Sequence, residues 1–430
     1  MDIASSRNAR ASRFAILLAS IVACILPGAA CSVINTEEKR STYRFDHQFN
    51  VESAAFRRSL DGLGAAMTAG NAAVILRNGD ETFSAMTKAI RAARRSVCME
   101  MYIFKDDEAG RQVADAMIEA ARKGVKVRVL LDAVGSKPGR LAVELRGAGV
   151  ILRTYRPIHP FSIHKVGRRT HRRILVIDGK ICFTGGIGID RRWLGNARDR
   201  SEWRDTQVQA TGPVASQMQA IFGEDWTYTT GEILAGDEFY PATDPDGPLL
   251  AQAIRVSRGD ASSLAKMLYY VAIQSAEKSI HIENAYFLPD RQVREALVQA
   301  VARGVDVQII VPGRSIDIPL VRSASRLHYG ALLRGGVKIF EYERTMMHNK
   351  TMVVDGLYSI IGSINFDARS MKRNAEESLA FYDRGLGRTM EEMFGEDLKG
   401  CRQVTYREWS HRGIPARLSE LVCWIWEPYY

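Results

Sequence analysis

The chain has 430 residues, of which 46% are hydrophobic and 25% are charged, and these proportions exclude wholesale disorder, a collagen-like fibre and a polytopic membrane protein. Lysine and arginine outnumber aspartate and glutamate by 59 to 49, a basic balance that suits a protein meeting phosphate groups on lipids or on nucleic acid. Six cysteines are too few for a disulfide scaffold, and none has zinc-type spacing with other cysteines or histidines, so no structural metal is expected.

The first 36 residues read as a targeting or anchoring segment. Arg7, Arg10 and Arg13 precede an uncharged stretch that runs to Thr36. Basic residues before an apolar run of about 20 residues are typical of a secretory signal or of a single membrane anchor. Because positive residues stay on the cytoplasmic side, the rest of the chain is expected to be exported. The sequence leaves open whether the segment is cleaved, lipidated or retained.

Beyond about residue 75 the chain reads twice. Residues 111–124, RQVADAMIEAARKG, recur as residues 291–304, RQVREALVQAVARG. Each copy has the spacing of an amphipathic helix that ends at a glycine, Gly124 or Gly304, and enters an apolar strand, VKVRVLLD or VDVQIIVP. The segments upstream, SVCMEMYIF and SIHIENAYF, and downstream, GAGVILRTY and RGGVKIFEY, also match in order. An ordered series of matches indicates a duplication.

Strands that alternate with helices predict helices packed on a parallel sheet. We therefore expect an α/β protein with two lobes, each a mixed, largely parallel sheet flanked by helices. The first lobe is predicted to cover residues 45–235 and the second residues 264–430. A segment rich in proline, aspartate and glycine, residues 236–263, is predicted to link them. The end of that segment, AIRVS, also has the composition of a strand of the second lobe.

Each lobe carries a histidine at the head of an apolar strand, HRRILVIDG in the first and HNKTMVVDG in the second. In both copies a cation follows two residues later and an aspartate seven residues later: His171, Arg173 and Asp178, and His348, Lys350 and Asp355. Alternate residues of a strand point to the same face, so imidazole and cation are expected to project together. Aspartate before glycine favours a hairpin turn, which the aspartates are expected to order rather than to react. Equivalent copies in a duplicated chain favour a functional role for both histidines.

These paired motifs, with GSINFDARS after the second, resemble those of the phospholipase D superfamily and, more narrowly, of the bacterial cardiolipin synthases. The resemblance covers roughly residues 70–400. It implies two pseudo-symmetric phospholipase D-like lobes with one active site at their interface, a covalent phosphohistidine intermediate, and neither a metal nor another cofactor. It also implies that His171 is the nucleophile and His348 the general acid and then base. The catalytic set that it implies is His171, Arg173, Asp178, His348, Lys350 and Asp355.

The chemistry of these residue types agrees with the resemblance. Exchange at a phosphodiester needs a nucleophile and a leaving-group acid on opposite sides of phosphorus, and cations for the remaining oxygens. Each catalytic histidine also needs an acceptor that holds its tautomer. By the resemblance this acceptor is an acid further along each lobe, Asp205 in WRD for the first and Glu376 in NAEE for the second, where Glu377 is adjacent. Ser363 and Asn365 are candidate ligands of the phosphate oxygens, with a turn-forming pair as the alternative.

The two copies depart from each other in two places. The first has Arg173 where the motif has lysine, which keeps the charge but is bulkier and planar. It also has Gly188 where the second has Asn365. The two lobes are therefore expected to contact a phosphate unequally.

The function that the resemblance implies is a phosphatidyltransferase that forms cardiolipin from phospholipids, for example from two phosphatidylglycerols with release of glycerol. The alternatives are a phospholipase D hydrolase and a phosphodiesterase or nuclease of the same superfamily. The intact histidines argue against a non-catalytic scaffold. The expected partners are phospholipid substrates and a membrane surface, without nucleic acid. We expect a monomer associated with the bacterial cell membrane, with its catalytic part on the periplasmic or extracytoplasmic side.

Overall fold

The computed structural model describes residues 43–46, 49–64, 66–158, 168–257, 264–413, 417 and 420. The chain divides into two compact units, Met1–Arg44 and Phe45–Tyr430, and the description below concerns the second. The segment predicted to be a signal or anchor, residues 1–36, lies outside the described residues. Within the described ranges, no helix combines the length and the apolar character needed to cross a bilayer.

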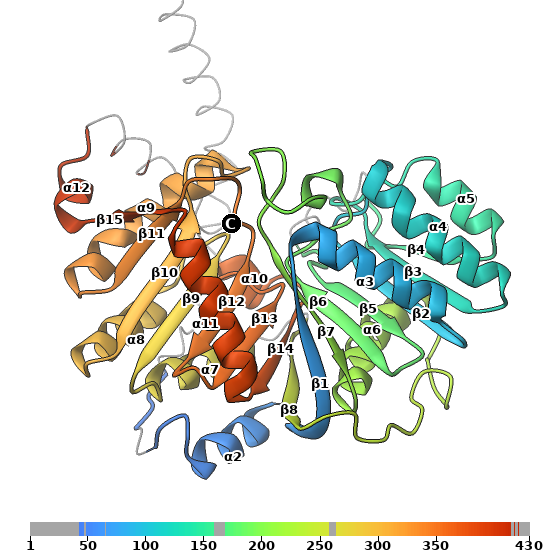
Figure 1. Cartoon of the computed structure of the whole chain (residues 1–430), viewed down its shortest axis with the longest axis horizontal. Helices are drawn as coiled ribbons and strands as arrows, with labels where there is room; N and C mark the ends of the chain where they lie inside the picture. The colour runs from blue at the N-terminus through green and yellow to red at the C-terminus, as the bar shows by residue number, and fades with distance from the viewer. Residues whose placement is uncertain are drawn as a thin grey trace, which may run out of the picture. The chain divides into compact units, whose positions relative to one another are not determined.

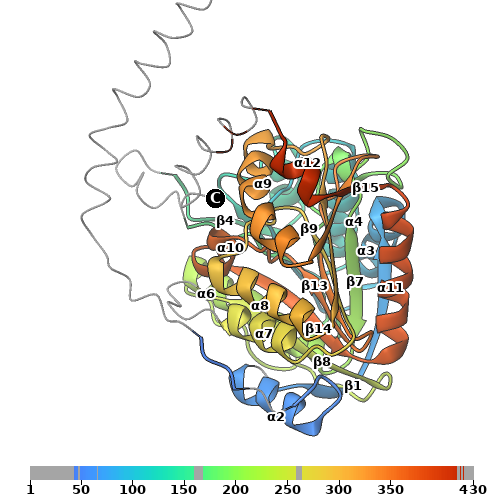
Figure 2. The same cartoon turned by 90° about the vertical axis from the view of Figure 1, so that its left-hand side faces the viewer.

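In the described part of this unit, fifteen strands form one continuous sheet, and helices cover both of its faces (Figures 1 and 2). Helices α3 and α11 lie on one face, whereas α6, α7 and α8 lie on the other (Figure 2). The first part of the unit contains α2 (Ala54–Leu63), β1 (Thr68–Arg77), α3 (Asn78–Ala92), β2 (Ser96–Met101), α4 (Glu108–Arg122), β3 (Lys126–Asp132), α5 (Leu141–Gly147), β4 (Ile151–Tyr155), β5 (Arg173–Ile177), β6 (Ile181–Gly185), the 3₁₀ turn η2 (Arg191–Trp193), β7 (Thr206–Thr211) and α6 (Val214–Thr230).

The second part repeats this succession of strands and helices. It contains β8 (Leu249–Val256), α7 (Leu264–Gln274), β9 (Ser279–Asn284), α8 (Arg291–Ala302), β10 (Asp306–Pro312), α9 (Pro319–Arg334), β11 (Lys338–Tyr342), β12 (Lys350–Val354), β13 (Tyr358–Gly362), α10 (Ala368–Lys372), β14 (Glu376–Tyr382), α11 (Arg384–Leu398), β15 (Cys401–Val404) and α12 (Tyr406–Ser410). The predicted α/β fold with two similar lobes is therefore confirmed.

The sheet is mixed, as predicted, but it is not largely parallel. The strand order is β15-β11-β10-β9-β12-β13-β14-β8-β1-β7-β6-β5-β2-β3-β4. Among the named strands, parallel pairing is limited to β2–β3–β4 and β9–β10–β11, where helices provide the crossovers that parallel neighbours require. The remaining neighbouring strands pair antiparallel, and two of these pairs are the hairpins β5–β6 and β12–β13. The motif strands therefore lie in the antiparallel part of each lobe.

The boundary between the lobes differs from the prediction. Strand β8 lies inside the predicted linker 236–263 and pairs with β14 on one side and β1 on the other. The sequence allowed for a strand at AIRVS, and the structure begins it earlier, at Leu249. Helix α2, which was assigned to the first lobe, buries Phe56 and Leu60 in the core of the second, because an amphipathic helix requires an apolar partner.

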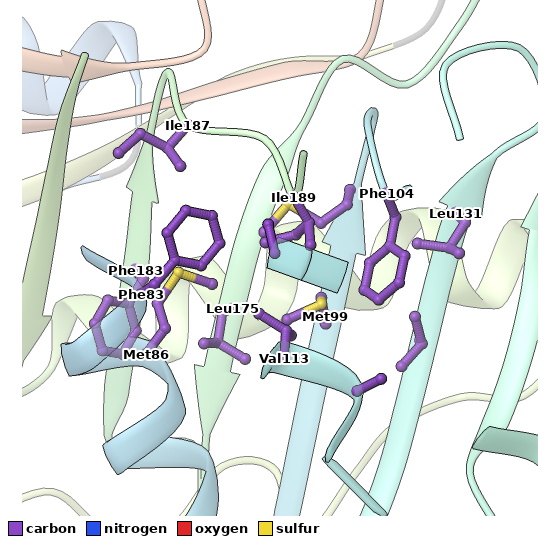
Figure 3. Packing of buried hydrophobic residues seen from close by; sticks show 14 of the residues in the cluster. Phe83, Met86, Met99, Phe104, Val113, Leu131, Leu175, Phe183, Ile187 and Ile189 are labelled. Carbon is purple, nitrogen blue, oxygen red and sulfur yellow. The ribbon is translucent and has the colours of Figure 1, made fainter. Parts of the chain in front are cut away.

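The core of the first lobe fixes the loops that follow β2 and β6. Phe104, after β2, and Ile187 and Ile189, after β6, are buried with the side chains of α3, α4 and the strands (Figure 3). The two loops also pair through their backbones, because Lys105 donates its N–H to the carbonyl of Ile189 at 2.9 Å. The loop that carries η2 is thereby held over the ends of the strands.

Candidate active site

The two motif histidines lie just before strands β5 and β12, at the positions that the sequence predicted. His171 is 7% exposed and His348 is 3% exposed, so both imidazoles are largely removed from solvent. The five residues of each strand that follows are buried. A continuous apolar strand is typical of a sheet that is covered on both faces, and here it gives each histidine a rigid base.

The backbone before each histidine pairs with a segment from the other lobe. His171 donates its N–H to the carbonyl of Ala375 at 2.8 Å, and His348 donates to the carbonyl of Arg204 at 2.7 Å. These contacts belong to two short parallel bridges, Thr170 with Ala375 and Arg204 with Met347. Glu376 follows Ala375 and Asp205 follows Arg204 in the sequence, so each bridge places an acid next to the histidine of the opposite lobe.

The carboxylates therefore serve the histidines crosswise, which corrects the expectation that each acid serves its own lobe. The Nδ1 atom of His171 lies 2.9 and 3.0 Å from the carboxylate oxygens of Glu376. The Nδ1 atom of His348 lies 2.9 Å from Oδ2 of Asp205. Both carboxylates are fully buried. The physical reason is the bridge pairing, which places each acid beside the strand of the other lobe.

The position of Glu376 at the start of β14 determines which of the two adjacent glutamates contacts His171. Neighbouring residues of a strand point to opposite faces, and only Glu376 points to His171. Glu377 instead accepts the backbone N–H of Arg173 at 3.0 Å and the hydroxyl of Thr184 at 2.8 Å. Glu377 thereby anchors the first residue of β5 rather than the imidazole.

The cation of each motif folds onto its own histidine, as the alternation of the strand predicted. Nη2 of Arg173 lies 2.9 Å from Nε2 of His171. Nζ of Lys350 lies 2.9 Å from Nδ1 and 3.1 Å from Nε2 of His348. Arg173 is fully buried and Lys350 is 2% exposed. Each half of the site therefore holds a buried positive charge directly beside the ring nitrogens of its histidine.

The charges of the two lobes act on one another, so the two half-sites form one electrostatic unit. Burial lowers the pKa of His171 well below its usual value, and Arg173 and Lys350 lower it further. Burial, then Lys350 and Arg173, lower the pKa of His348 in the same way. Burial lowers the pKa of Lys350 to about 7. Both imidazoles are therefore neutral near pH 7 in the substrate-free protein.

Burial acts in the opposite direction on the two acids. It raises the pKa of Glu376 to about 7, although hydrogen bonds from Ser363 and Ser370 oppose the shift. It raises the pKa of Asp205 to about 6, opposed by Lys350 and by the indole of Trp193. The acids and Lys350 thus titrate within the same pH range, which makes the charge of the site sensitive to pH around neutrality.

Asp178 and Asp355 lie at the far ends of β5 and β12, away from the histidines. Asp178 accepts the backbone N–H groups of Arg94, Arg95 and Ser96 at 2.7 to 3.2 Å. Asp355 does the same for residues 277–279. Both residues have positive φ, 53° in each case, at the start of a hairpin turn. These contacts agree with the predicted turn role, and a strand of five residues separates each aspartate from its imidazole. The grouping of the two aspartates with the catalytic residues stays a prediction.

Ser363 and Asn365 are both buried, and Ser363 lies beside Glu376. The hydroxyl of Ser363 donates to Glu376 at 2.5 Å, and Ser370 donates to the same carboxylate at 2.7 Å. Asn365 is 2% exposed, and its Oδ1 has no hydrogen-bond partner among the described residues. Ser363 therefore orders the acid, whereas Asn365 leaves a buried acceptor oxygen without a partner among the described residues. A phosphate-binding role for either residue stays a prediction.

The first lobe orders its acid with an indole instead of hydroxyls. Nε1 of Trp193 donates to Oδ2 of Asp205 at 2.8 Å. A Cβ atom on Gly186 would lie 2.1 Å from a carboxylate oxygen of Asp205, and one on Gly188 would lie 3.1 Å from the Trp193 ring. The surroundings of the two acids therefore differ, since the indole of Trp193 takes the place that hydroxyl groups have in the second lobe. The unequal contact of the two lobes with a phosphate stays a prediction.

Sequence reasoning missed Trp193, Ser370 and the two tyrosines that flank the imidazoles. The ring centres of Trp193 and His348 are 5.2 Å apart, and those of Tyr102 and His171 are 4.9 Å apart. The second tyrosine, Tyr286, packs against His348. The duplication could have identified Trp193 and Ser370. DRRW after β6 occupies the same place as DARS after β13, so Trp193 and Ser370 are equivalent positions.

The arrangement suits exchange at a phosphate ester. In each half, a carboxylate on Nδ1 leaves Nε2 as the reactive nitrogen of the imidazole. Two neutral imidazoles can then supply a nucleophile and a proton carrier, and the two cations can neutralise phosphate oxygens. No single lobe contains a complete set, because each histidine takes its acceptor from the other.

Comparison with known proteins agrees with this geometry. The family described as "Cardiolipin synthase, PLD-like domain" matches residues 86–226 and 269–398. The chain is 35% identical over 350 residues to a probable cardiolipin synthase, YwiE, of Bacillus subtilis, covering 80% of this chain and 70% of that protein. It is 37% identical over 358 residues to cardiolipin synthase A of Pseudomonas putida, covering 82% and 74%.

The fold is also similar to that of a solved structure. The crystal structure of phosphatidylserine synthase from Haemophilus influenzae superposes with a TM-score of 0.66 at 15% identity, covering 86% of this chain and all of that one. This likeness concerns the fold. The family match over two segments that contain both motifs, together with the relatives, shows that the chain belongs to the phospholipase D-like cardiolipin synthase family.

Proposed function

We propose that this protein is a phosphatidyltransferase that joins two phosphatidylglycerol molecules into cardiolipin and releases glycerol. The observation that carries the proposal is the crossed arrangement, in which His171 is paired with Glu376 and His348 with Asp205. It supplies two buried imidazoles, and Arg173 and Lys350 act electrostatically on both of them. Relatives named cardiolipin synthases support the lipid substrate.

In the first step, Nε2 of His171 attacks the phosphorus of the donor lipid. The bond from phosphorus to the glycerol oxygen breaks, and His348 gives that oxygen a proton. His348 is neutral in the empty site because of its burial and the adjacent cations. A bound phosphodiester anion offsets those cations, so it raises the pKa of His348 and prepares it as the acid.

In the second step, His348 accepts the proton from a hydroxyl of the acceptor phosphatidylglycerol. The oxygen attacks phosphorus, the phosphorus–nitrogen bond breaks, and His171 is restored. Arg173 donates to Nε2 of His171 at 2.9 Å before substrate binds. The phosphate must therefore draw the guanidinium onto its own oxygens, which frees the nitrogen that attacks.

Arg173 should tolerate lysine but not alanine. Arg173→Lys keeps the charge that neutralises phosphate, so kcat/KM for phosphatidylglycerol should stay within about tenfold of wild type. Arg173→Ala removes the charge and should lower kcat/KM by about 10²- to 10³-fold. Steady-state kinetics on phosphatidylglycerol vesicles would measure both. Equal losses in the two variants would contradict the role of charge.

The pH dependence of kcat/KM should be bell-shaped with a maximum near pH 7. Glu376 must be ionised to accept Nδ1–H, and because its pKa is raised to about 7, activity should fall as pH drops through that value. Lys350 must be charged, and because its pKa is lowered to about 7, activity should also fall as pH rises. Lys350→Arg keeps its charge, so the alkaline limb should move up by about two pH units or more. An unmoved alkaline limb would assign it to another group.

The substrates place the enzyme at a lipid surface. We propose that the catalytic part works on the extracytoplasmic side of the bacterial membrane as a monomer. The basic balance of the sequence supports contact with anionic headgroups. Protease treatment of intact spheroplasts, followed by detection of the catalytic part, tests the side, and light scattering of detergent-purified protein tests the monomer.

The decisive test of the reaction is product analysis. Purified full-length protein is incubated with phosphatidylglycerol vesicles, and lipids and released headgroups are identified by mass spectrometry. Cardiolipin and glycerol in equal amounts are expected. Phosphatidic acid without cardiolipin would make the protein a hydrolase, and intact lipids beside cleaved nucleic acid would make it a nuclease.

A further inference from the structure

The loop between β10 and α9 places a carboxylate beside the candidate active site. Tyr286 follows β9, and its ring packs edge-to-face against that of His348 with centres 6.1 Å apart. Its hydroxyl donates to Asp317, with both carboxylate oxygens at 2.9 Å. Asp317 is exposed, and its charge favours the protonated form of Lys350. An accessible anion therefore lies one tyrosine side chain away from the imidazole.

This anion is unexpected in a site that receives phosphate. Arg173, Lys350 and Arg369 act on His171, and Arg192 acts on His348, so the surroundings are otherwise cationic. A fixed negative charge there disfavours a phosphate unless it recognises a different part of the same substrate. Carboxylate oxygens accept several hydrogen bonds each, so Asp317 retains acceptor capacity beyond the bond from Tyr286.

The first lobe has no equivalent arrangement among its described residues. Tyr102 packs against His171 as Tyr286 packs against His348. The carboxylate near Tyr102 is Asp132, which is 1% exposed and forms an ion pair with Arg169 at 2.9 Å. The accessible carboxylate is thus confined to the side of His348, where the proposed reaction moves a proton to and from a glycerol oxygen.

We propose that Asp317, oriented by Tyr286, binds the free hydroxyl groups of the glycerol headgroup and so selects phosphatidylglycerol. The inference rests on the proposed function, because it assigns the alcohol that His348 protonates and deprotonates. In the first step Asp317 holds the leaving glycerol by a hydroxyl that does not react. In the second it holds the acceptor glycerol in the same way. Positioning by a non-reacting group is an efficient source of selectivity, because an analogue without the hydroxyl leaves a polar group unpaired.

The test compares two lipids that differ only in these hydroxyls. Phosphatidylpropanol has the length of the glycerol headgroup but no free hydroxyl. Vesicles that contain both lipids in equal amounts supply phosphatidylglycerol as the acceptor for either donor. The ratio of glycerol to propanol released by the full-length protein then gives the ratio of the two kcat/KM values. Asp317→Asn should lower the ratio of phosphatidylglycerol to phosphatidylpropanol by about 10- to 100-fold. Tyr286→Phe should lower it less. Asp306→Asn, at the opposite end of β10, is the matched control and should keep the wild-type ratio.

The outcomes separate this inference from the proposed function. A fall of both rates by the same factor in Asp317→Asn, with the ratio kept, would reduce Asp317 to a structural role and overturn the inference. A wild type that prefers phosphatidylethanolamine, with that preference lost in Asp317→Asn, would assign the carboxylate to an ammonium group and also overturn it. Absence of cardiolipin with wild type would instead contradict the transferase, while headgroup release still reports the ratio.

Discussion

Replacing either His171 or His348 by alanine is expected to lower cardiolipin formation by at least about 10⁴-fold. The reason is that the two imidazoles act in one site, as nucleophile and as proton carrier, and neither lobe can replace the other. The measurement is turnover of phosphatidylglycerol vesicles by each purified variant. His281, which is partly buried on β9 and stacked on Phe394, provides the matched control, and His281→Ala should retain the wild-type order of magnitude.

A donor with a good leaving group distinguishes the roles of the two histidines. Phosphatidyl-p-nitrophenol needs little acid assistance, so His348→Ala should still release one equivalent of nitrophenolate and stop at the phosphohistidine. His171→Ala should give no burst. Label from the donor phosphate should remain on the first variant and not on the second. A burst from His171→Ala alone would exchange the assignments, and one variant with normal turnover would refute the shared site.

Removing the charge of either acid is expected to lower kcat by about 10²- to 10⁴-fold without unfolding the protein. Glu376→Gln and Asp205→Asn keep the shape of the side chain but present an amide that does not hold Nδ1–H in the reactive tautomer. Kinetics with phosphatidylglycerol, together with circular dichroism to verify folding, measure the effect. Both losses should be large, because each acid serves one of the two essential imidazoles.

Glu377→Gln is the matched control for Glu376→Gln. Glu377 is equally buried but accepts hydrogen bonds from the backbone N–H of Arg173 and the hydroxyl of Thr184. A glutamine oxygen can accept the same bonds, so the loss should be smaller by about tenfold or more. If the two variants lost activity equally, the pairing of Glu376 with His171 would not account for the effect.

The sequence predicted the local elements and the chemical groups of the site well. The helices that begin near Arg111 and Arg291, their terminal glycines with positive φ, and the strands that follow are as expected. These features depend on neighbours in the chain, which periodicity and turn residues report directly. The histidine and cation of each motif also project together, because a strand fixes the direction of alternate residues.

Pairing between distant segments could not be predicted in the same way. His171 and Glu376 are 205 residues apart in sequence, and the bridges that join them form only when the two lobes share one sheet. Local pattern equally allowed each acid to serve its own lobe. The excess of antiparallel pairs was not predicted for a similar reason. Strands β5 and β12 are buried on both faces, so they have the continuous apolar sequence that is typical of parallel strands. The Tyr286–Asp317 pair has no motif at all.

The most direct test of the composite site is nitrogen NMR of the imidazoles. The protein contains eight histidines, and labelling them with ¹⁵N gives separate Nδ1 and Nε2 signals that His171→Ala and His348→Ala assign by loss. Glu376→Gln should shift the Nδ1 signal of His171 and leave that of His348 close to its position, whereas Asp205→Asn should do the reverse. If Asp205→Asn instead shifted His171, each acid would serve its own lobe and the crossed site would be contradicted.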